Sequence, residues 1–365
     1  MSQGSRPPEQ GRDGSTARQV SRDSGTLWTE PGAWPVAPGV HRIPLPLPMD
    51  GLRAINVYVV EADDGLVLID GGWAIPESRQ LFESCLAQLG HRLGDIRRFL
   101  VTHLHRDHYT QAYVLGRELG VPVSLGSGDR ASLDLIGAGT RGERDLEDPN
   151  LVRLRAAGAE HLVGPWRRLT PANQTALDSY GAPDLWLDGD VPLDLGGRAV
   201  DAVSTPGHTQ GHYVFAERAA GLLFAGDHVL PTITPSIGFE PAWVDQPLRD
   251  FLQSLAKVRA MPDLELLPAH GPVAPSSHVR VDELVAHHDT RLVLCEKAVA
   301  GGARTAWEVG GELPWTRHQR RLAELDPFDA VLAAFETLAH LELLAAQGRV
   351  DRSVDAGVRS FAPLG

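Results

Sequence analysis

Long apolar runs are missing from this chain of 365 residues, whose mean hydropathy is −0.15. No stretch approaches the roughly 20 consecutive apolar residues that a membrane-spanning helix needs. The first 30 residues also lack the apolar core of a secretory signal peptide. We therefore expect a cytoplasmic protein without a membrane segment.

Cysteine is nearly absent, and the two examples are Cys85 and Cys295. They lie far apart in the sequence, in segments of helical character and in different predicted domains. Because disulfides are rare in cytosolic proteins, we predict that both thiols are reduced and structural.

Basic residues are outnumbered, with 34 lysines and arginines against 47 aspartates and glutamates and a formal net charge of −13. Nucleic-acid affinity is dominated by neutralisation of phosphates with Lys and Arg, and no basic stripe is evident in the sequence. We interpret the densest basic cluster, Arg317 with Arg320 and Arg321, as a solvated helix face. The composition therefore argues against a nucleic-acid partner.

Shifts in composition divide the chain into three parts. Residues up to Glu30 are rich in Ser, Gly, Arg, Gln and Pro and contain too few apolar side chains to order themselves. Near the C-terminus, Ala, Leu, Glu, Arg and His recur with helical periodicity. We predict a disordered tail at 1–34, a large catalytic domain at 35–275 and a smaller helical domain at 276–365.

Apolar runs separated by turn signals predict an α+β fold. Strands are expected at 40–45, 55–60, 66–70, 96–101, 121–125, 199–204, 212–216 and 264–267. The turn signal Asp63–Gly65 predicts a hairpin, and the runs 185–187 and 191–195 predict a second one. Helices are expected at 76–89, 109–119, 130–135, 145–157, 247–260, 279–300 and 327–347, followed by short strands at 349–351 and 360–362.

One stretch, Thr102–His108, concentrates potential metal ligands: His103, His105, Asp107 and His108. It follows the predicted strand at 96–101. Residues two apart in an extended segment point to the same side, so His103 and His105 should face one point in space. If a helix then begins, Asp107 and His108 lie in its first turn and reach a second point nearby. One short loop can therefore serve two metals.

Three further ligand-type residues follow apolar runs and lie beside Gly or Pro, namely His208, Asp227 and His270. A lone histidine is usually a satisfied core or surface residue. Seven ligand-type residues in strand-to-loop contexts favour a metal site instead.

In their order along the chain, these residues resemble the His-x-His-x-Asp-His motif, the later His, the bridging Asp and the last His of the metallo-β-lactamase-fold hydrolase superfamily. The early strand that ends at Asp70 matches as well, and the resemblance covers roughly residues 35–275. It implies a four-layer αββα sandwich and two divalent metal ions, with zinc as the default and iron or manganese as alternatives. The implied ligands are His103, His105 and His208 for one ion, and Asp107, His108 and His270 for the other, with Asp227 bridging them.

The resemblance also implies a mechanism. A water shared by two metal ions loses a proton near neutral pH and attacks a polarised carbonyl or phosphorus. Asp107 and Asp227 are the predicted catalytic carboxylates, since Asp107 can relay the proton and Asp227 holds both metals.

Three neighbouring residues are expected to act without binding a metal. The resemblance implies that Asp70 lies beneath the site and holds a ligand histidine by a hydrogen bond, which fixes the histidine tautomer. His212 is predicted to shape its loop through a hydrogen bond. For His228 two interpretations stay open: it faces the cleft and acts on the leaving group, or it packs beside the site.

The branches of the superfamily narrow the substrate. Zinc β-lactamases lack the bridging aspartate, so Asp227 argues against antibiotic hydrolysis. Glyoxalase II is similar in all seven ligands, but its basic glutathione-binding residues have no counterpart in the apolar loop Val229–Ser236. We therefore predict a small-molecule acyl substrate, namely a thioester, an ester or a lactone, with a β-lactamase-like endoribonuclease as the alternative.

Two segments go beyond a minimal version of this fold. Residues 121–184 either form a wall above the metal cleft or decorate the periphery, and the apolar loop 229–243 is expected to cover the site. Residues 276–365 resemble the winged-helix-like domain found on some members of the superfamily. Because this domain carries many acidic residues, we expect it to form a homodimer or to close the cleft rather than to bind DNA.

Overall fold

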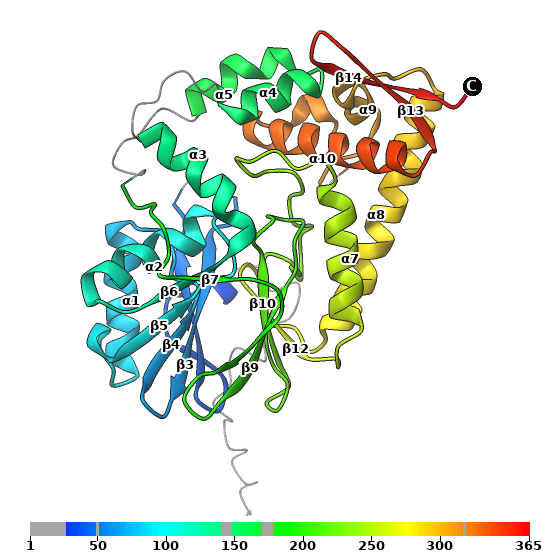
Figure 1. Ribbon diagram of the computed structural model, residues 1–365. Helices are drawn as coiled ribbons and strands as arrows, with labels where there is room; N and C mark the ends of the chain where they lie inside the picture. Colours follow the sequence, from blue (N-terminus) through cyan, green and yellow to red (C-terminus); the bar gives the residue numbers. More distant parts are fainter. Residues whose placement is uncertain (1–26, 49–50, 141–147, 170–177, 317–318) are drawn as a thin grey trace, which may run out of the picture.

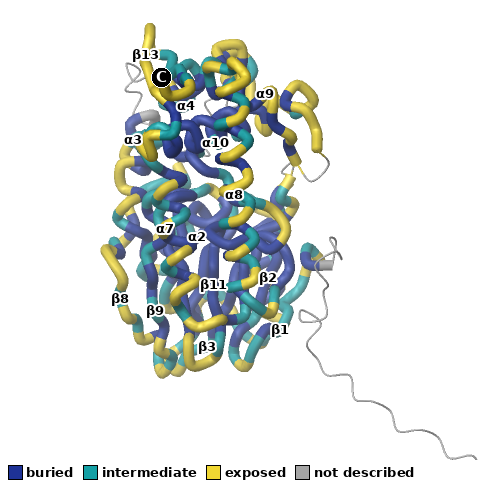
Figure 2. The backbone as a smooth tube through the Cα atoms, turned by 90° about the vertical axis from the view of Figure 1, so that its right-hand side faces the viewer, coloured by how far each residue is buried: buried dark blue, intermediate teal, exposed yellow. Residues whose placement is uncertain are grey.

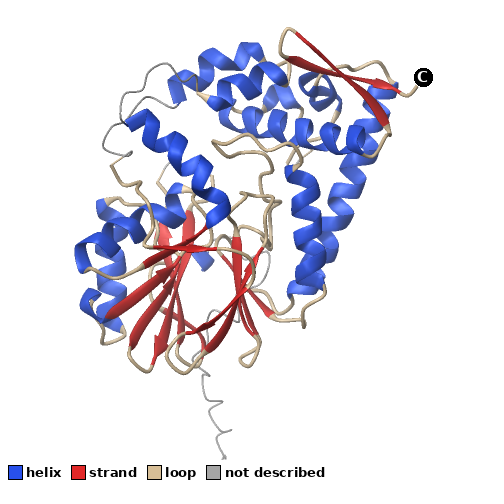
Figure 3. Ribbon diagram, in the orientation of Figure 1, coloured by secondary structure: helices blue, strands red, loops and turns tan. Residues whose placement is uncertain are grey.

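The computed structural model describes residues 27–48, 51–140, 148–169, 178–316 and 319–365. Two β-sheets pack face to face, and helices cover both outer faces (Figure 1, Figure 3). The αββα sandwich predicted from the sequence is therefore confirmed.

The first sheet has seven strands in the spatial order β1-β2-β3-β4-β5-β6-β7. Its first four strands pair antiparallel, and the pairs from β4 to β7 are parallel. The strands are β1 (Trp34–Ala37), β2 (Val40–Pro46), β3 (Ala54–Ala62), β4 (Gly65–Ile69), β5 (Ile96–Leu100), β6 (Val123–Gly126) and β7 (Leu185–Leu187).

The second sheet has five strands in the order β12-β11-β10-β9-β8. All of its pairs are antiparallel except β11 with β12. The strands are β8 (Val191–Asp194), β9 (Ala199–Ser204), β10 (Tyr213–Glu217), β11 (Leu222–Gly226) and β12 (Glu265–Pro268).

The predicted second hairpin is wrong. Strand β7 pairs parallel with β6 in the first sheet, whereas β8 pairs with β9 in the second sheet. The turn signal Asp188–Asp190 between them carries the chain from one sheet to the other. Two short apolar runs around a turn suit a hairpin or a crossover equally well, and the available pairing partners decide between them.

Alternation along the strands assigns their two faces. Leu68 of β4 packs toward the helices and its neighbour Ile69 packs between the sheets. In β10, Val214 faces the outer helices and Phe215 faces the other sheet. Three apolar clusters result, and the central strands of both sheets are largely buried (Figure 2). The edge strands β1, β7 and β8 are partly exposed.

Helices begin and end where the sequence provides capping residues. Pro76 is the first residue of α1, and Gly120, in the left-handed conformation, ends α2. Helices α1 (Pro76–Gln88) and α2 (Arg106–Leu119) cover the first sheet, and α7 (Pro247–Arg259) and α8 (Ser277–Ala300) cover the second.

The segment between β6 and β7 and the C-terminal segment pack together. One apolar cluster contains Leu154 and Trp166 from the first and Phe335 and Phe361 from the second, together with residues of α7 and α8. The C-terminal segment is mainly helical, as expected, and its likeness to a winged helix stays a prediction. The elements concerned are α3 (Arg130–Thr140), α4 (Pro149–Ala156), α5 (Val163–Leu169), α9 (Ala306–Glu312), α10 (Pro327–Ala346), β13 (Val350–Asp355) and β14 (Val358–Pro363).

The predicted N-terminal tail lies outside the described residues up to position 26. Its last part, from residue 27, contains a short 3-10 helix (Leu27–Thr29), and Trp28 there is buried. Cys85 and Cys295 are buried and form no disulfide, in different apolar clusters. Over the described parts of the chain, none of the helices combines the length and apolar composition needed to cross a bilayer.

Candidate metal centre

Loops at one end of the two sheets bring the seven predicted ligands together. The four ligands of the Thr102–His108 stretch lie between the end of β5 and the first turn of α2. His208, Asp227 and His270 follow β9, β11 and β12. The ligand atoms form two groups, and within each group they lie within 4.8 Å of one another. The groups are His103, His105, His208 and Asp227, and Asp107, His108 and His270.

Asp227 reaches both groups, as a bridging carboxylate would. Its Oδ2 lies 3.6 Å from Nε2 of His208 in the first group. Its Oδ1 lies 3.6 Å from Nε2 of His108 and 3.4 Å from Nε2 of His270 in the second. The two oxygens of one side chain therefore face the two places where cations would bind.

Each of the five histidines has one ring nitrogen engaged by an oxygen atom outside the two groups, which leaves the other nitrogen directed at the centre. The engaged atoms and their partners are His208 Nδ1 with Ser236 O (2.8 Å), His270 Nδ1 with Ala54 O (2.8 Å), His108 Nδ1 with Asp70 Oδ2 (2.8 Å), His103 Nδ1 with Thr102 Oγ1 (3.0 Å) and His105 Nε2 with Phe239 O (3.1 Å). His105 therefore offers Nδ1, and the other four histidines offer Nε2.

Several of the atoms that point to the centre are buried without a hydrogen-bond partner among the described residues. They include Nε2 of His103, His108 and His270, and Oδ1 of Asp227. Burying an unsatisfied polar atom is costly, so these four atoms of the two groups are suited to bind cations. Nitrogen and carboxylate donors suit zinc, iron or manganese, so the residues present fit a pair of divalent ions.

Electrostatics separates the two groups. Burial, together with the neighbouring histidines, holds the pKa of His103 and His208 well below the ordinary value, so both are neutral as metal ligands must be. Burial also acts on His108, but the carboxylates of Asp70, Asp107 and Asp227 outweigh it and raise its pKa to about 10. The carboxylates around the second group therefore stabilise positive charge there.

Asp70 lies where the sequence predicted, beneath the site. Its carboxylate accepts hydrogen bonds from the backbone N–H of Thr102 (2.8 Å) and from Nδ1 of His108 (2.8 Å). The backbone of Asp70 is left-handed, with φ 63°, a strained conformation for a residue with a side chain. The strain directs the carboxylate under the His motif, where it fixes the tautomer of His108.

His212 shapes its loop and is not free to bind a metal. The backbone N–H of Asp227 donates to Nε2 of His212 (3.1 Å), so the proton of the neutral ring lies on Nδ1, beside Thr205 Oγ1 (2.9 Å). Gly226, with φ 51°, makes this approach possible, because a Cβ there would lie 2.7 Å from that same Nε2. His212 thus positions Asp227.

His228 is fully buried and contacts the ring of Phe251 on α7 at a centroid distance of 4.9 Å. Burial lowers its pKa to about 3, so the ring is neutral. Of the two interpretations, this geometry favours packing beside the site over contact with a leaving group.

Asp129 was missed by the sequence analysis. Its buried carboxylate accepts the backbone N–H of Leu104 at Oδ2 and that of Gly211 at Oδ1, both at 2.8 Å. These two amides belong to the loops that carry His103 and His208, so Asp129 holds the two ligand loops in register. No local signal identifies it, because Asp129 follows β6, away from every ligand in the sequence.

Glu240 was missed as well. It is buried in the loop 229–243 and accepts the backbone N–H of Gln210 at 3.3 Å. Arg153 of α4 donates to the carbonyl groups of Glu240 (2.8 Å) and Ala242 (3.2 Å). Helices of the inserted segment therefore hold the loop whose Phe239 carbonyl contacts His105. Of the two interpretations of residues 121–184, this favours a wall above the metal cleft over a peripheral decoration.

The protonation of Glu240 gives a testable pH dependence. Burial, reinforced by Asp129, raises its pKa from 4.5 to about 8, so the folded state binds this proton more tightly than the unfolded state does. Its contribution to stability is full below pH 4.5 and is lost as the pH rises toward 8. We expect Glu240→Gln to flatten the fall in unfolding free energy between pH 5 and 8, measured by urea unfolding.

The matched control is Glu160→Gln, because the Glu160 side chain is 67% exposed. This variant should keep the pH slope of the wild type. An unchanged slope in Glu240→Gln would show that Glu240 is ionised in the folded protein throughout this range.

Comparison with known proteins agrees with this geometry. The family model described as "Metallo-beta-lactamase superfamily" matches residues 50–270, which is more than half of the chain. The chain belongs to the metallo-beta-lactamase superfamily. The family uses divalent metals, and residues 50–270 contain all seven ligands and Asp70.

Three relatives extend the likeness over most of the chain. A beta-lactamase domain protein from Burkholderia ambifaria has a TM-score of 0.72 and 27% identity and covers 91% of this chain and 94% of its own. A metallo-beta-lactamase family protein from Thermus thermophilus has a TM-score of 0.68 and 27% identity, covering 90% and 99%. The atrochrysone carboxyl ACP thioesterase AgnL7 of Paecilomyces divaricatus is 26% identical over 86% of this chain and 81% of its own length.

The likeness therefore includes the C-terminal helices and is not confined to the two sheets. This metallo-beta-lactamase superfamily member is a metal-dependent hydrolase whose ligand groups are complete. His105, half-buried, and Asp107, 9% exposed, are its most accessible ligands, which marks the open side of the centre.

Proposed function

We propose that the protein hydrolyses acyl thioesters with a pair of divalent ions, zinc by default. The observation that carries the proposal is the complete set of seven converging ligand atoms, in which Asp227 faces both groups. The thioesterase named among its relatives supports the bond type. Esters and lactones react by the same attack on a carbonyl, and they are the nearest alternatives.

The loop 229–243 supports an acyl substrate. It places Phe239 against His105, with ring centroids 6.0 Å apart, and Trp166 of α5 also packs on Phe239. Apolar and aromatic side chains around a few polar groups are typical of small-molecule pockets. An acyl chain lying along this loop would be shielded from water beside the open ligands.

The chemistry divides between the ions and the protein. Two divalent ions, when bound, supply Lewis acidity and lower the pKa of water. His103, His105 and His208 would hold one ion and Asp107, His108 and His270 the other, with Asp227 shared.

Asp107 is the residue placed to move a proton. Burial opposes its ionisation, but His108 and His270 outweigh burial and hold its pKa well below the ordinary value. Asp107 is therefore an ionised carboxylate. Its Oδ2 lies 3.3 Å from Nε2 of His270, at the open side of the site. It can take the proton released during attack and deliver it to the sulfur of the departing thiolate, which leaves as the thiol.

An assay against four substrate types tests the proposal. We expect metal-dependent turnover of an acyl thioester that exceeds turnover of the matched ester and lactone, and little cleavage of single-stranded RNA at low or moderate salt. His103→Ala should abolish the turnover, whereas His91→Ala, a surface histidine away from the ligands, should keep it. RNA cleavage that falls steeply with salt, without acyl turnover, would establish the ribonuclease instead.

A further inference from the structure

A large cleft opens beside the metal centre. It has a volume of about 1740 Å³ and reaches the ligand His270 at one side. Helices α8 and α10, the loop 231–234 and residues 314–316 form its other walls. Pockets for small ligands usually have about 300–1,000 Å³, so this cleft can accept a substrate with a long second arm beyond the acyl group.

The charged side chains that line the cleft are mainly basic, although the whole chain has a net charge of −13. Among the described residues of the lining, the acidic ones are Asp329 and Glu336, and the arginines are Arg53, Arg280, Arg291 and Arg320. Helix α8 provides Arg280, His287 and Arg291 at spacings of seven and four, so these three side chains share one face of the helix.

Arg291 is the residue of this face whose guanidinium keeps N–H groups without a hydrogen-bond acceptor among the described residues. It is 6% exposed, its Nη1 donates to Pro314 O (2.8 Å), and its guanidinium lies 4.1 Å from the ring centre of Trp315. Its Nε and Nη2 make no hydrogen bond among the described residues, although Nε forms a long ion pair with Oε1 of Glu336 at 3.9 Å. A buried guanidinium on the wall of a cleft, with N–H groups that no protein acceptor satisfies, is suited to pair with an anion.

Arg280 has a different part in this wall. It donates to the carbonyl groups of Leu230 and Ile233 (2.5 and 2.8 Å) and pairs with Glu283 (2.9 Å). It therefore ties the loop that covers the metal centre to α8, and it adds positive charge to the cleft without being the anion ligand.

We propose that the cleft binds the phosphate-bearing arm of the thiol half of a thioester, with Arg291 pairing with the phosphate. The inference rests on the proposed function and specifies the carrier side of the substrate. The acyl group then lies under the loop 229–243, and the thiol departs into the cleft past His270. In coenzyme A and in a carrier protein, this arm is the 4′-phosphopantetheine group.

Thr290→Glu tests the site with little disturbance of the fold, because Thr290 is exposed and lines the cleft next to Arg291. The new carboxylate would add a negative charge to the wall of the cleft and repel phosphate. Val293→Glu is the matched control, since Val293 is 58% exposed on the same helix and is not part of the cleft. Arg291→Gln is the direct variant, and the melting temperature of each variant checks its folding.

Calorimetry on the full-length, metal-loaded protein measures binding of coenzyme A and of 4′-phosphopantetheine. We expect Thr290→Glu and Arg291→Gln to weaken both at least tenfold and Val293→Glu to leave both unchanged. If the variants weaken the binding of coenzyme A but not that of 4′-phosphopantetheine, the cleft does not bind the pantetheine arm. Arg291 would then pair with the adenosine phosphates of coenzyme A. Equal binding in all variants, or no binding of either compound, would overturn the site.

Kinetics separates this inference from the proposed function. With one acyl group, kcat/KM should fall at least tenfold in Thr290→Glu for the coenzyme A thioester and stay unchanged for the uncharged N-acetylcysteamine thioester. If Thr290→Glu hydrolyses both thioesters as fast as the wild type does, the cleft assignment is refuted and thioester hydrolysis stands. If neither thioester is hydrolysed the proposed function fails, and the calorimetric result still decides the anion site.

Discussion

Replacing Asp227 with alanine is expected to remove one of two metal ions per chain and to lower kcat by at least about a hundredfold to a thousandfold, the loss typical of one essential electrostatic group. The reason is its position, because its two oxygens face His208 on one side and His108 and His270 on the other. No other carboxylate among the described residues belongs to the first ligand group. Elemental analysis of protein purified without chelator, together with initial rates on an acyl thioester, measures both effects.

Asp201→Ala is the matched control, since Asp201 lies on β9 and pairs at the surface with Arg218 at 2.6 Å. It should retain two ions and full turnover. Full activity in Asp227→Ala would show that the carboxylate does not bridge. Wild-type protein containing no zinc, iron or manganese would refute the dinuclear centre itself.

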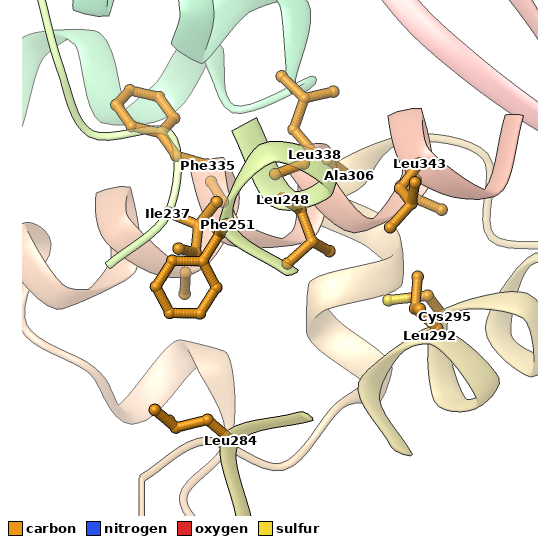
Figure 4. Packing of buried hydrophobic residues seen from close by; sticks show 14 of the residues in the cluster. Ile237, Leu248, Phe251, Leu284, Leu292, Cys295, Ala306, Phe335, Leu338 and Leu343 are labelled. Carbon is orange, nitrogen blue, oxygen red and sulfur yellow. The ribbon is translucent and has the colours of Figure 1, made fainter. Parts of the chain in front are cut away.

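Replacing Phe251 with alanine is expected to cost roughly 3–5 kcal/mol of unfolding free energy, the usual loss for a buried aromatic residue. Phe251 is fully buried on α7, and Figure 4 shows it among Ile237, Leu248 and Phe335. It joins the C-terminal helices to the loops of the metal centre. Gly207, the residue that precedes the ligand His208, packs closely on Phe251. A Cβ at Gly207 would lie only 2.4 Å from the Cα of Phe251.

Urea unfolding of the metal-loaded protein measures this loss. Phe328→Ala, the same substitution at a side chain that is 40% exposed, should cost far less and serves as the control. Similar losses in both variants would mean that α7 does not anchor the core. Because the ligand loop rests on α7, we also expect Phe251→Ala to bind metal more weakly, whereas Phe328→Ala should not.

Much of the site could be predicted because its residues follow local rules. His103 and His105 come at the end of a strand, and Asp107 and His108 lie in the first turn of α2. These relations depend on a few consecutive residues, so the sequence alone contains them. Asp70 also comes at the end of a predicted strand, but its place beneath the site was implied by the resemblance, and its left-handed backbone could not be foreseen.

The missed residues act across long distances in the sequence. Asp129 joins Leu104 to Gly211, and Glu240 contacts Gln210 beneath Arg153 of the inserted segment. A buried carboxylate of this kind has no periodicity or spacing that distinguishes it from a surface residue. Its function is defined by amides that reach it from other loops.

The sequence by itself determined the α+β class and most of the strands and helices, because apolar periodicity is a local property. The αββα arrangement and the expected metal ligands came from the resemblance of the His-x-His-x-Asp-His motif and of the later His and Asp residues to a known family. Only the tertiary structure decided that β7 and β8 lie in different sheets and that the inserted helices pack on the C-terminal helices. It alone brought Arg291 and His270 to one cleft. Such pairings depend on which surfaces remain to be buried once the whole chain has folded, and no local segment carries that information.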